Sequence, residues 1–389
     1  MNIKDSNIAI VHDWFVEKSF GGSEKVTFIL NDLLNERYST PDIFSLTSNI
    51  KSSKKKSFKG RKIKTSFVQS LPFGKTNVQR YLPILPYAIE QFDLRAYDLI
   101  ISSSHAIAKG VITSPEQLHI SYVHTPMRYA WDQMNTYLKK SKLSKFGFEI
   151  PIRFMLYKLR AWDFYSSQRL DHIIANSNFT SKRIKKYWGL ESDVINPPVD
   201  IKRFNYNNPR ENFYISLNRL VPNKRIDLLI KAFNKLNLPL IIIGDGPERF
   251  KLQNMSNSNI KFIKKISDKE VENYMSRCRA FVYAGIEDFG IAPVEAMASG
   301  APVIAYGKGG ILDTVNCYKK QDKEKVSTGL LFKNQTSEDI IDTISWFEDK
   351  KLWKNFNPEM LNEYSQNFSI ENFTSKFDLL INKAWEKFK

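Results

Sequence analysis

The segment from Tyr283 to Tyr306, YAGIEDFGIAPVEAMASGAPVIAY, constrains the fold of this chain more than any other. It starts at the end of an apolar run, Ala280 to Ala284, that is typical of a strand, and the residues from Pro293 to Ser299 are typical of a helix. Gly300 suits the position after the last helical turn, and a proline two residues later forbids continuation. A second strand, Pro302 to Tyr306, follows. Strand, loop, helix and strand in this order predict one unit of a parallel sheet.

Two carboxylates in this segment, Glu287 and Glu295, are separated by seven residues that include Gly290. The first lies in the loop after a strand, and the second lies about a turn inside the helix. Ligands of open α/β sheets bind at the carboxyl ends of the strands, and backbone N–H groups at a helix start suit a phosphate. The alternative is a solvated carboxylate and an ordinary helix charge. The pattern favours a ligand site.

The same segment resembles the signature of retaining nucleotide-sugar glycosyltransferases of the GT-B fold, in glycosyltransferase family 4. That signature is E-x7-E with F-G-x-x-x-x-E inside, and five residues match it: Glu287, Phe289, Gly290, Pro293 and Glu295. The resemblance implies an α/β, GT-B architecture in which two Rossmann-like domains with parallel sheets face each other across a cleft. It also implies that one stretch binds the donor, through Phe289, Gly290, Ile291 and Glu295.

The length of 389 residues is enough for two domains. A proline-rich crossing, Val194 to Asp200, and a polar stretch after it mark the boundary. We expect an acceptor-side domain over residues 1–200 and a donor domain over residues 205–368. The resemblance implies that a C-terminal helix, at about residues 370–389, crosses back onto the first domain.

Composition narrows the class of protein. The chain is 42% hydrophobic and 25% charged, which is typical of a globular protein. Two cysteines cannot form a disulfide framework, the first ten residues do not read as a signal peptide, and no apolar run reaches the length of a membrane span. We therefore expect a cytoplasmic location. The net charge of +17 predicts an anionic partner: nucleic acid, a membrane surface or a phosphorylated ligand.

Basic residues gather in the first half of the chain. Lys51 to Lys64 holds eight basic residues and no acidic one, and Lys139 to Lys145 adds more. These runs are either solvated loops or contacts to anionic lipid headgroups, in which case Phe58 is a candidate to insert into the membrane. The helix expected over Pro151 to Leu170 mixes cations with aromatic residues, and it is either a core helix or faces the membrane or the acceptor. We expect peripheral association with the inner face of the cell membrane.

The first strand, Asn7 to Asp13, leads to Gly21 and Gly22 before a helix that starts at Glu24. Glycines at such a turn either make it flexible or let the backbone approach a ligand closely. In the family that this chain resembles, this loop faces the donor diphosphate, which implies donor contacts by Gly21 and Gly22.

A strand expected over His119 to His124 is followed by Thr-Pro-Met-Arg-Tyr-Ala-Trp-Asp. A lone histidine usually has a structural role, but this one lies at an edge where ligands bind. The string is similar to that of WbaZ-like mannosyltransferases of bacterial surface polysaccharide synthesis. The similarity implies that His124 contacts the transferred sugar, and it makes Arg128 and Asp132 acceptor-side candidates. His105, also in a loop after a strand, is a further candidate.

Two cations in the second half, Arg219 and Lys224, lie in a loop between a strand and a helix. Such a pair can neutralise a diphosphate, although loop cations are also commonly just solvated. The stretch resembles the family pattern G-R-L-x-x-x-K-G-x-D, with Asn218 and Arg225 in place of the two glycines. In the family that this chain resembles, a later strand-end loop packs on the nucleotide base, which implies a base contact by Ile266. Lys264 stands where the family has glycine.

The resemblance implies a mechanism with retention, in which the leaving phosphate helps to deprotonate the acceptor. Cations and backbone N–H groups would stabilise the leaving diphosphate. Glu295 would bind the ribose, because a carboxylate accepts two hydroxyl hydrogen bonds well, and Glu287 would contact the sugar hydroxyls. The catalytic candidates are His124, Arg219, Lys224 and Glu287. No D-x-D and no cluster with metal-ligand spacing is seen, so we expect no metal and no cofactor.

The expected donor is GDP-mannose and the expected acceptor is a lipid-linked or polysaccharide glycan of the cell surface. A UDP-sugar donor is the alternative within the same fold. A nucleic-acid binder would need base-stacking aromatics or a known motif, and neither is seen, so no nucleic-acid partner is expected. A catalytically inactive relative is disfavoured by the presence of both glutamates and both cations.

Overall fold

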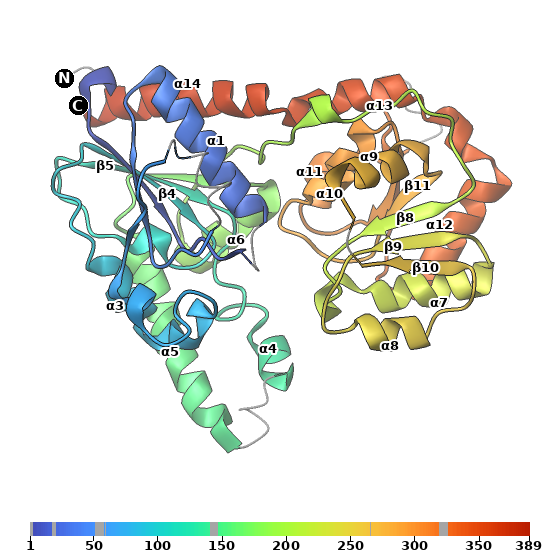
Figure 1. The fold of residues 1–389 in the computed structure, drawn as a ribbon, viewed down its shortest axis with the longest axis horizontal. Helices are drawn as coiled ribbons and strands as arrows, with labels where there is room; N and C mark the ends of the chain where they lie inside the picture. Colours follow the sequence, from blue (N-terminus) through green and yellow to red (C-terminus); the bar gives the residue numbers. More distant parts are fainter. Residues whose placement is uncertain are drawn as a thin grey trace. The chain divides into compact units, whose positions relative to one another are not determined.

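The computed structural model describes residues 3–17, 21–50, 58, 60–140, 147–264, 266–318 and 326–389. Phe20 and most of the lysines in the two basic runs, at 51–57, 59 and 141–146, lie outside the described residues. The chain divides into two compact units, Met1–Pro197 with Phe373–Lys389 (unit 1), and Pro198–Asn372 (unit 2). Each unit is built on its own parallel sheet (Figure 1).

Unit 1 holds a sheet in the order β3-β2-β1-β4-β5-β6-β7, and its pairs are all parallel. This is the order of a Rossmann-like fold with one strand added. The central strands are completely buried, which explains their unbroken apolar runs. The strands are β1 (Ile8–His12), β2 (Asp42–Ser45), β3 (Lys64–Thr65), β4 (Leu99–Ser104), β5 (Leu118–Val123), β6 (His172–Ala175) and β7 (Asp193–Val194).

Helices cover both faces of this sheet. The described α-helices of unit 1 are α1 (Gly22–Arg37), α3 (Leu85–Glu90), α4 (Met134–Lys140), α5 (Glu149–Ser167), α6 (Asn178–Trp188) and most of α14 (Ile370–Phe388). Two 3-10 helices matter below, η5 (Val78–Ile84) and η6 (Ala108–Gly110). α14 buries Phe373, Phe377 and Ile381 in the unit 1 core, so the end of the chain completes the first unit.

Unit 2 holds a six-stranded sheet in the order β10-β9-β8-β11-β12-β13, again with parallel pairs. Its strands are β8 (Tyr214–Leu217), β9 (Leu240–Ile243), β10 (Ile260–Ile263), β11 (Ala280–Tyr283), β12 (Val303–Tyr306) and β13 (Gly329–Phe332). Its described α-helices are α7 (Ile226–Leu236), α8 (Arg249–Asn254), α9 (Asp268–Arg277), α10 (Ile291–Ala298), α11 (Ile311–Thr314), α12 (Ser337–Asp349) and α13 (Pro358–Ser365). Its described 3-10 helices are η8 (Ile201–Arg203), η9 (Pro222–Lys224), η10 (Leu352–Asn355) and η11 (Gln366–Phe368). The predicted fold class, two Rossmann-like parts with parallel sheets, is confirmed.

The suggestion that Phe58 inserts into a membrane is wrong. Its side chain is fully buried, and its ring lies edge-on to the rings of Phe15 and Phe28, at centroid distances of 5.4 and 4.8 Å. Burial of the Phe58 ring against two other aromatic rings stabilises the fold, so this side chain is part of the hydrophobic core. Among the described helices, none is both long and apolar enough to cross a bilayer.

Candidate functional site

In unit 2 the loops that follow β8 and β11 are neighbours. The two strands pair in parallel, with Ala280 opposite Tyr214, so their carboxyl ends lie at the same edge of the sheet. Lys224, in η9, forms an ion pair with Glu287, in the loop after β11, and the Tyr283 hydroxyl donates a hydrogen bond to the same carboxylate oxygen. The Lys224 and Glu287 side chains are only 17% and 22% exposed, so the pair is partly shielded from water.

Glycines let the backbone pack closely around this pair. A Cβ on Gly285 would lie 2.8 Å from the Tyr283 hydroxyl oxygen and 3.1 Å from the Lys224 Cα. The Gly310 N–H donates to the Glu287 carbonyl at 2.9 Å, and a Cβ at that position would clash with the Asp288 backbone. The loop that carries Glu287 is therefore held in place from two sides.

Glu295 lies on α10, which starts after Gly290, a residue with a positive φ of 102° that favours glycine. Its buried carboxylate binds the Arg203 guanidinium at 2.8 Å, and Arg203 also approaches Glu272 at 3.6 Å. Arg203 was not predicted from the sequence. It lies 92 positions before Glu295, and no local pattern links the two.

The other donor-side candidates of unit 2 have different environments. The Phe289 side chain is buried and packs on the Phe368 ring, so only its backbone can meet a ligand. Ile266 and Ile291 are half-buried, before α9 and at the start of α10. Arg219 is exposed in the loop after β8.

Arg225 explains one departure from the family pattern. Its φ is +52°, in the left-handed region that glycine adopts without strain. The family glycine at this place thus meets a backbone requirement, and Arg225 adopts the same conformation while it pairs with Asp227 at 3.1 Å.

In unit 1, Asp13 organises the loop after β4. Its fully buried carboxylate accepts the backbone N–H groups of His105, Ala106, Ile107 and Ala108, at 2.5 to 3.1 Å. His105 Nδ1 lies 3.0 Å from the same carboxylate. Burial alone raises the pKa of Asp13, but His105 and the hydrogen bonds outweigh it and hold that pKa well below its usual range. Asp13 is therefore a fixed negative charge in the core.

A chain of polar side chains joins three strand ends. His12 Nδ1 lies 3.1 Å from the Thr27 hydroxyl, which donates to Ser103 Oγ at 2.9 Å, and Ser103 Oγ lies 2.9 Å from His124 Nε2. The register explains this grouping, because His12 is opposite Ser103 and Ser103 is opposite Tyr122. His124 thus lies beside His12 and Ser103.

Burial sets the charge of these histidines. It lowers the pKa of His12 and, much further, that of His124, so both are neutral near pH 7. Burial also acts to lower the pKa of His105, but the Asp13 carboxylate outweighs it and raises that pKa above 6.5. The unit 1 edge therefore combines a neutral His124, the residue predicted to contact the sugar, with His105, whose raised pKa favours its protonated form.

Gly21 and Gly22 lie at the start of α1. The Gly21 N–H donates to the Glu24 carboxylate at 2.8 Å, and Glu24 is buried. That hydrogen bond fixes the start of α1. The N–H groups of the first helical turn have no acceptor within the helix, as in any α-helix.

The acceptor-side candidates lie after β5 in a segment tied to α6. Arg183 binds Asp132 at 2.6 Å and donates to the Thr125 hydroxyl at 2.7 Å, so one buried guanidinium fixes both ends of the stretch after His124. Arg128 is half-buried between them. Arg183 was missed from the sequence, where it reads as one more charge on a basic helix.

No group of three His, Cys, Asp or Glu side chains that could hold a metal ion occurs within the part of the chain that the structure describes.

Comparison with known families covers nearly the whole chain. Residues 20–203 match the model described as Glycosyltransferase Family 4, and residues 199–368 match the one described as Glycosyl transferases group 1. The chain belongs to glycosyltransferase family 4. The family predicted from the Glu287–Glu295 segment is confirmed.

Several curated relatives of this family 4 chain are mannosyltransferases. It is 28% identical over 262 residues to the α-1,3/1,6-mannosyltransferase ALG2 of Candida glabrata, covering 53% of this chain and 56% of the relative. ALG2 of Saccharomyces cerevisiae is 27% identical over 308 residues, 65% of this chain and 59% of the relative. The O-antigen chain mannosyltransferase RfbU of Salmonella typhimurium is 30% identical over 152 residues, 36% of this chain and 44% of that one. The match thus spans somewhat more than half the length of the ALG2 proteins.

Solved structures show the fold over the full length. A sucrose-phosphate synthase from Thermosynechococcus elongatus matches with a TM-score of 0.72 at 16% identity, covering 98% of this chain and all of that one. Anabaena HepE in complex with UDP matches with a TM-score of 0.68 at 15% identity, covering 97% and 100%. The fold is GT-B.

Proposed function

We propose that this chain is a retaining hexosyltransferase that moves mannose from GDP-mannose onto a lipid-linked or polysaccharide acceptor in cell-surface glycan synthesis. The observation that carries this proposal is the cluster of Lys224, Glu287 and Tyr283 at the carboxyl edge of the unit 2 sheet. It occurs in a family 4 chain whose similar curated relatives act as mannosyltransferases.

The chemistry requires stabilisation of a leaving diphosphate as the anomeric C–O bond breaks. Arg219 and Lys224 would supply positive charge, and the backbone at Gly21 and Gly22 would supply N–H donors. The ion pair with Glu287 keeps the Lys224 ammonium at this edge before a donor arrives. Donor phosphates would then replace part of that contact.

Recognition of the sugar and the nucleoside would fall to the carboxylates and to His124. Glu287 would accept hydrogen bonds from the sugar hydroxyls, and Glu295 would accept those of the ribose. A neutral His124 suits a sugar hydroxyl, which carries no charge. Arg128 and Asp132 remain the acceptor-side proposals. No cofactor and no metal are part of this scheme.

The partners in this proposal are the nucleotide sugar, the lipid-linked glycan acceptor and an anionic membrane surface, without nucleic acid. The enzyme would act in the cytoplasm, peripherally at the inner face of the cell membrane. The net charge of +17 supports binding to an anionic membrane surface, because basic residues are attracted to anionic lipids. The relative RfbU is by its name an O-antigen chain mannosyltransferase, which supports a glycan acceptor.

The second candidate is transfer from a UDP-sugar, because Anabaena HepE of the same fold was solved with UDP. A thermal-shift comparison of GDP, UDP and ADP separates the two, since a ligand that binds only the native state raises the melting temperature. We expect GDP to give the largest shift and GDP-mannose to be consumed when a lipid-linked acceptor is supplied. A larger shift with UDP, together with turnover of a UDP-sugar, would overturn the GDP-mannose proposal.

A further inference from the structure

The helix α5 is apolar on the face that it shows to water. Its opposite face is buried through Leu156 and Leu159, as expected of a surface helix. The exposed face carries Ile150, Phe154 and Tyr157, which are 79%, 61% and 57% exposed. Their spacing of four and three residues puts them in one stripe along the helix. A helix that is apolar on both faces needs a second apolar partner.

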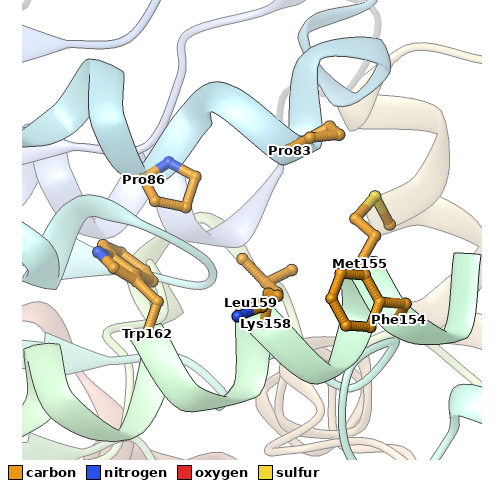
Figure 2. Close-up of a pocket in the computed structure, with 7 residues that line it drawn as sticks. All are labelled: Pro83, Pro86, Phe154, Met155, Lys158, Leu159 and Trp162. Atoms are coloured by element: carbon orange, nitrogen blue, oxygen red, sulfur yellow. The ribbon is translucent and has the colours of Figure 1, made fainter. Parts of the chain in front are cut away.

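A groove lies beside this stripe. It has a volume of about 340 Å³, with Pro83 and Pro86 on one wall and residues of α5 on the other. Figure 2 shows the side chains of Met155, Leu159 and Trp162 extending from α5 toward the two prolines, and the Phe154 ring lying over α5. Ile84 and Tyr87, which follow the two prolines in the sequence, are also exposed, at 38% and 61%. The N-terminal turns of α5 extend beyond the sheet of unit 1 (Figure 1).

Positive charge borders this surface. The Lys158 Nζ lies 5.5 Å from the Phe154 ring centroid, and Arg153 follows Ile150 by three residues. Glu149, the acidic residue at the helix start, is already paired with Arg153 at 2.7 Å. On the other wall, residues 71–90 contain Lys75 and Arg80 and one acidic residue, Glu90, which accepts a hydrogen bond from Trp162 Nε1 at 2.9 Å and pairs with Arg169. We call Ile150, Phe154 and Tyr157, with Arg153 and Lys158, the aromatic–basic face.

We propose that the aromatic–basic face rests on an anionic phospholipid bilayer, with its apolar side chains at the boundary between headgroups and acyl chains and its groove open to an acyl chain. Tyrosine and phenylalanine beside Arg and Lys match the chemistry of that boundary, where cations meet phosphates and rings meet hydrocarbon. Arg153 and Glu149 offset each other, so the positive charge comes from Lys158 on α5 and from Lys75 and Arg80 in the opposite segment, and this charge favours an anionic bilayer over a neutral apolar partner. The inference gives the membrane part of the proposed function a specific surface, and in that respect rests on it.

Sedimentation with vesicles tests the proposal on the full chain. Vesicles of phosphatidylcholine with phosphatidylglycerol should bind the chain, and vesicles of phosphatidylcholine alone should bind at least tenfold more weakly. The triple variant Ile150→Ser, Phe154→Ser, Tyr157→Ser should lose at least tenfold in binding to the anionic vesicles. The matched control is Phe250→Ser with Leu379→Ser, which removes equally exposed apolar side chains elsewhere. Binding of the control should equal that of the wild type.

Trp162 reports on the groove. Brominated acyl chains should quench tryptophan fluorescence in the wild type, and Trp162→Phe should remove a measurable part of that quenching. The proposal is overturned if the triple variant binds like the wild type or if both vesicle types bind equally. It is also overturned if the triple variant changes only self-association in sedimentation velocity, which would make the face a protein interface.

The GDP-induced thermal shift should be the same in the triple variant and the wild type. This separates the two proposals, because vesicle binding needs no donor and the GDP shift needs no vesicle. If the triple variant loses vesicle binding but keeps the GDP-induced thermal shift, the aromatic–basic face is required for membrane binding and not for donor binding. Absent GDP binding with intact vesicle binding would leave the face standing and overturn the donor assignment.

Discussion

Two glutamates that the sequence pattern treats as a pair have different partners in the structure. Glu287 is held by Lys224, on η9 in the loop after β8, and by the Tyr283 hydroxyl, at the end of β11. Glu295 is held by Arg203, which lies on η8 near the start of unit 2. Each carboxylate is thus oriented before any ligand arrives. The two positions are therefore expected to respond differently to mutation.

Lys224→Ala and Arg219→Ala should each lower the rate of sugar transfer on the order of 10²-fold or more, because each removes a cation from the leaving diphosphate. Neither side chain is in the hydrophobic core, so the melting temperature should change little. Steady-state kinetics with the confirmed donor and acceptor measure the effect. Lys251→Ala, an exposed lysine on α8, is the control and should keep wild-type activity. Wild-type turnover in both variants would remove the diphosphate assignment.

Glu295→Gln should weaken GDP binding about tenfold or more, because hydrogen bonds to a charged acceptor are worth roughly 1.5–3 kcal/mol. Arg203→Met should weaken it by a smaller factor of about five, since Arg203 only orients the carboxylate. Isothermal titration of GDP measures both. Lys202→Met is a matched control from the same short helix, where the lysine pairs with Glu371 instead. An Arg203→Met variant with wild-type affinity and a lower melting temperature would show a purely structural role.

Local patterns made part of the site predictable. Glu287, Glu295 and Lys224 lie in short strings whose residue types and spacing are informative on their own. Arg203 and Arg183 were missed because their contacts, to Glu295 and to Asp132, span 92 and 51 positions. Which arginine of a chain with 58 basic residues reaches a given carboxylate is decided by the tertiary fold.

The helix α5 is fastened by an ion pair inside the core. Lys109, on η6, binds Asp163 of α5 at 2.8 Å, and both side chains are at most 1% exposed. The indole N–H groups of Trp131 and Trp188 donate to the other Asp163 oxygen at 2.7 and 2.8 Å. The Lys109 ammonium also lies 5.0 Å from the Trp188 ring centroid. This network holds one end of α5 firmly while its other end carries the aromatic–basic face.

Asp163→Asn should destabilise unit 1 by about 3–5 kcal/mol, the usual effect of removing one partner of a buried pair. The asparagine fits the same space, but its amide would face the buried ammonium of Lys109 without a compensating charge. Urea denaturation followed by tryptophan fluorescence measures the loss. Asp93→Asn makes the same change in an exposed pair with Arg95 and should leave the midpoint unchanged. Equal midpoints for both variants would contradict the role given to the buried pair.

The bounds of strands and helices were predicted from the sequence more accurately than the burial of their side chains was. The predicted strands and helices around Glu287 and His124 match β11, α10, β12 and β5 to within about two residues, because apolar runs, glycine and proline act locally. For α5 the periodicity left a core and a membrane-facing role open, and the helix has a buried face and an exposed apolar face. Phe58 was misplaced because a single aromatic in a basic run gives no sign of the core that receives it.

Across the whole chain, the two units repeat one architecture with different chemistry at the carboxyl edge of the sheet. Unit 1 gathers histidines, serine and a buried aspartate, whereas unit 2 gathers lysine, tyrosine and two glutamates. His124 and Ser103 of unit 1 are neutral hydrogen-bonding groups that suit sugar hydroxyls, whereas the ionised Asp13 is occupied with backbone N–H groups. The Lys224 ammonium of unit 2 suits a phosphate. An acceptor-side role for the first unit and a donor role for the second stay predictions.

Sugar transfer should survive chelation by EDTA. A leaving diphosphate needs positive charge, and the unit 2 edge offers it as Arg219 and Lys224, of which Lys224 is 17% exposed and so poorly screened by water. Within the described ranges, no group of three His, Cys, Asp or Glu side chains could hold a metal ion. Initial rates measured with EDTA, and again after excess Mg²⁺ or Mn²⁺ is added, should agree within error. Loss of all activity in EDTA that either ion restores would show that a cation, and not this pair of side chains, carries the charge of the leaving group.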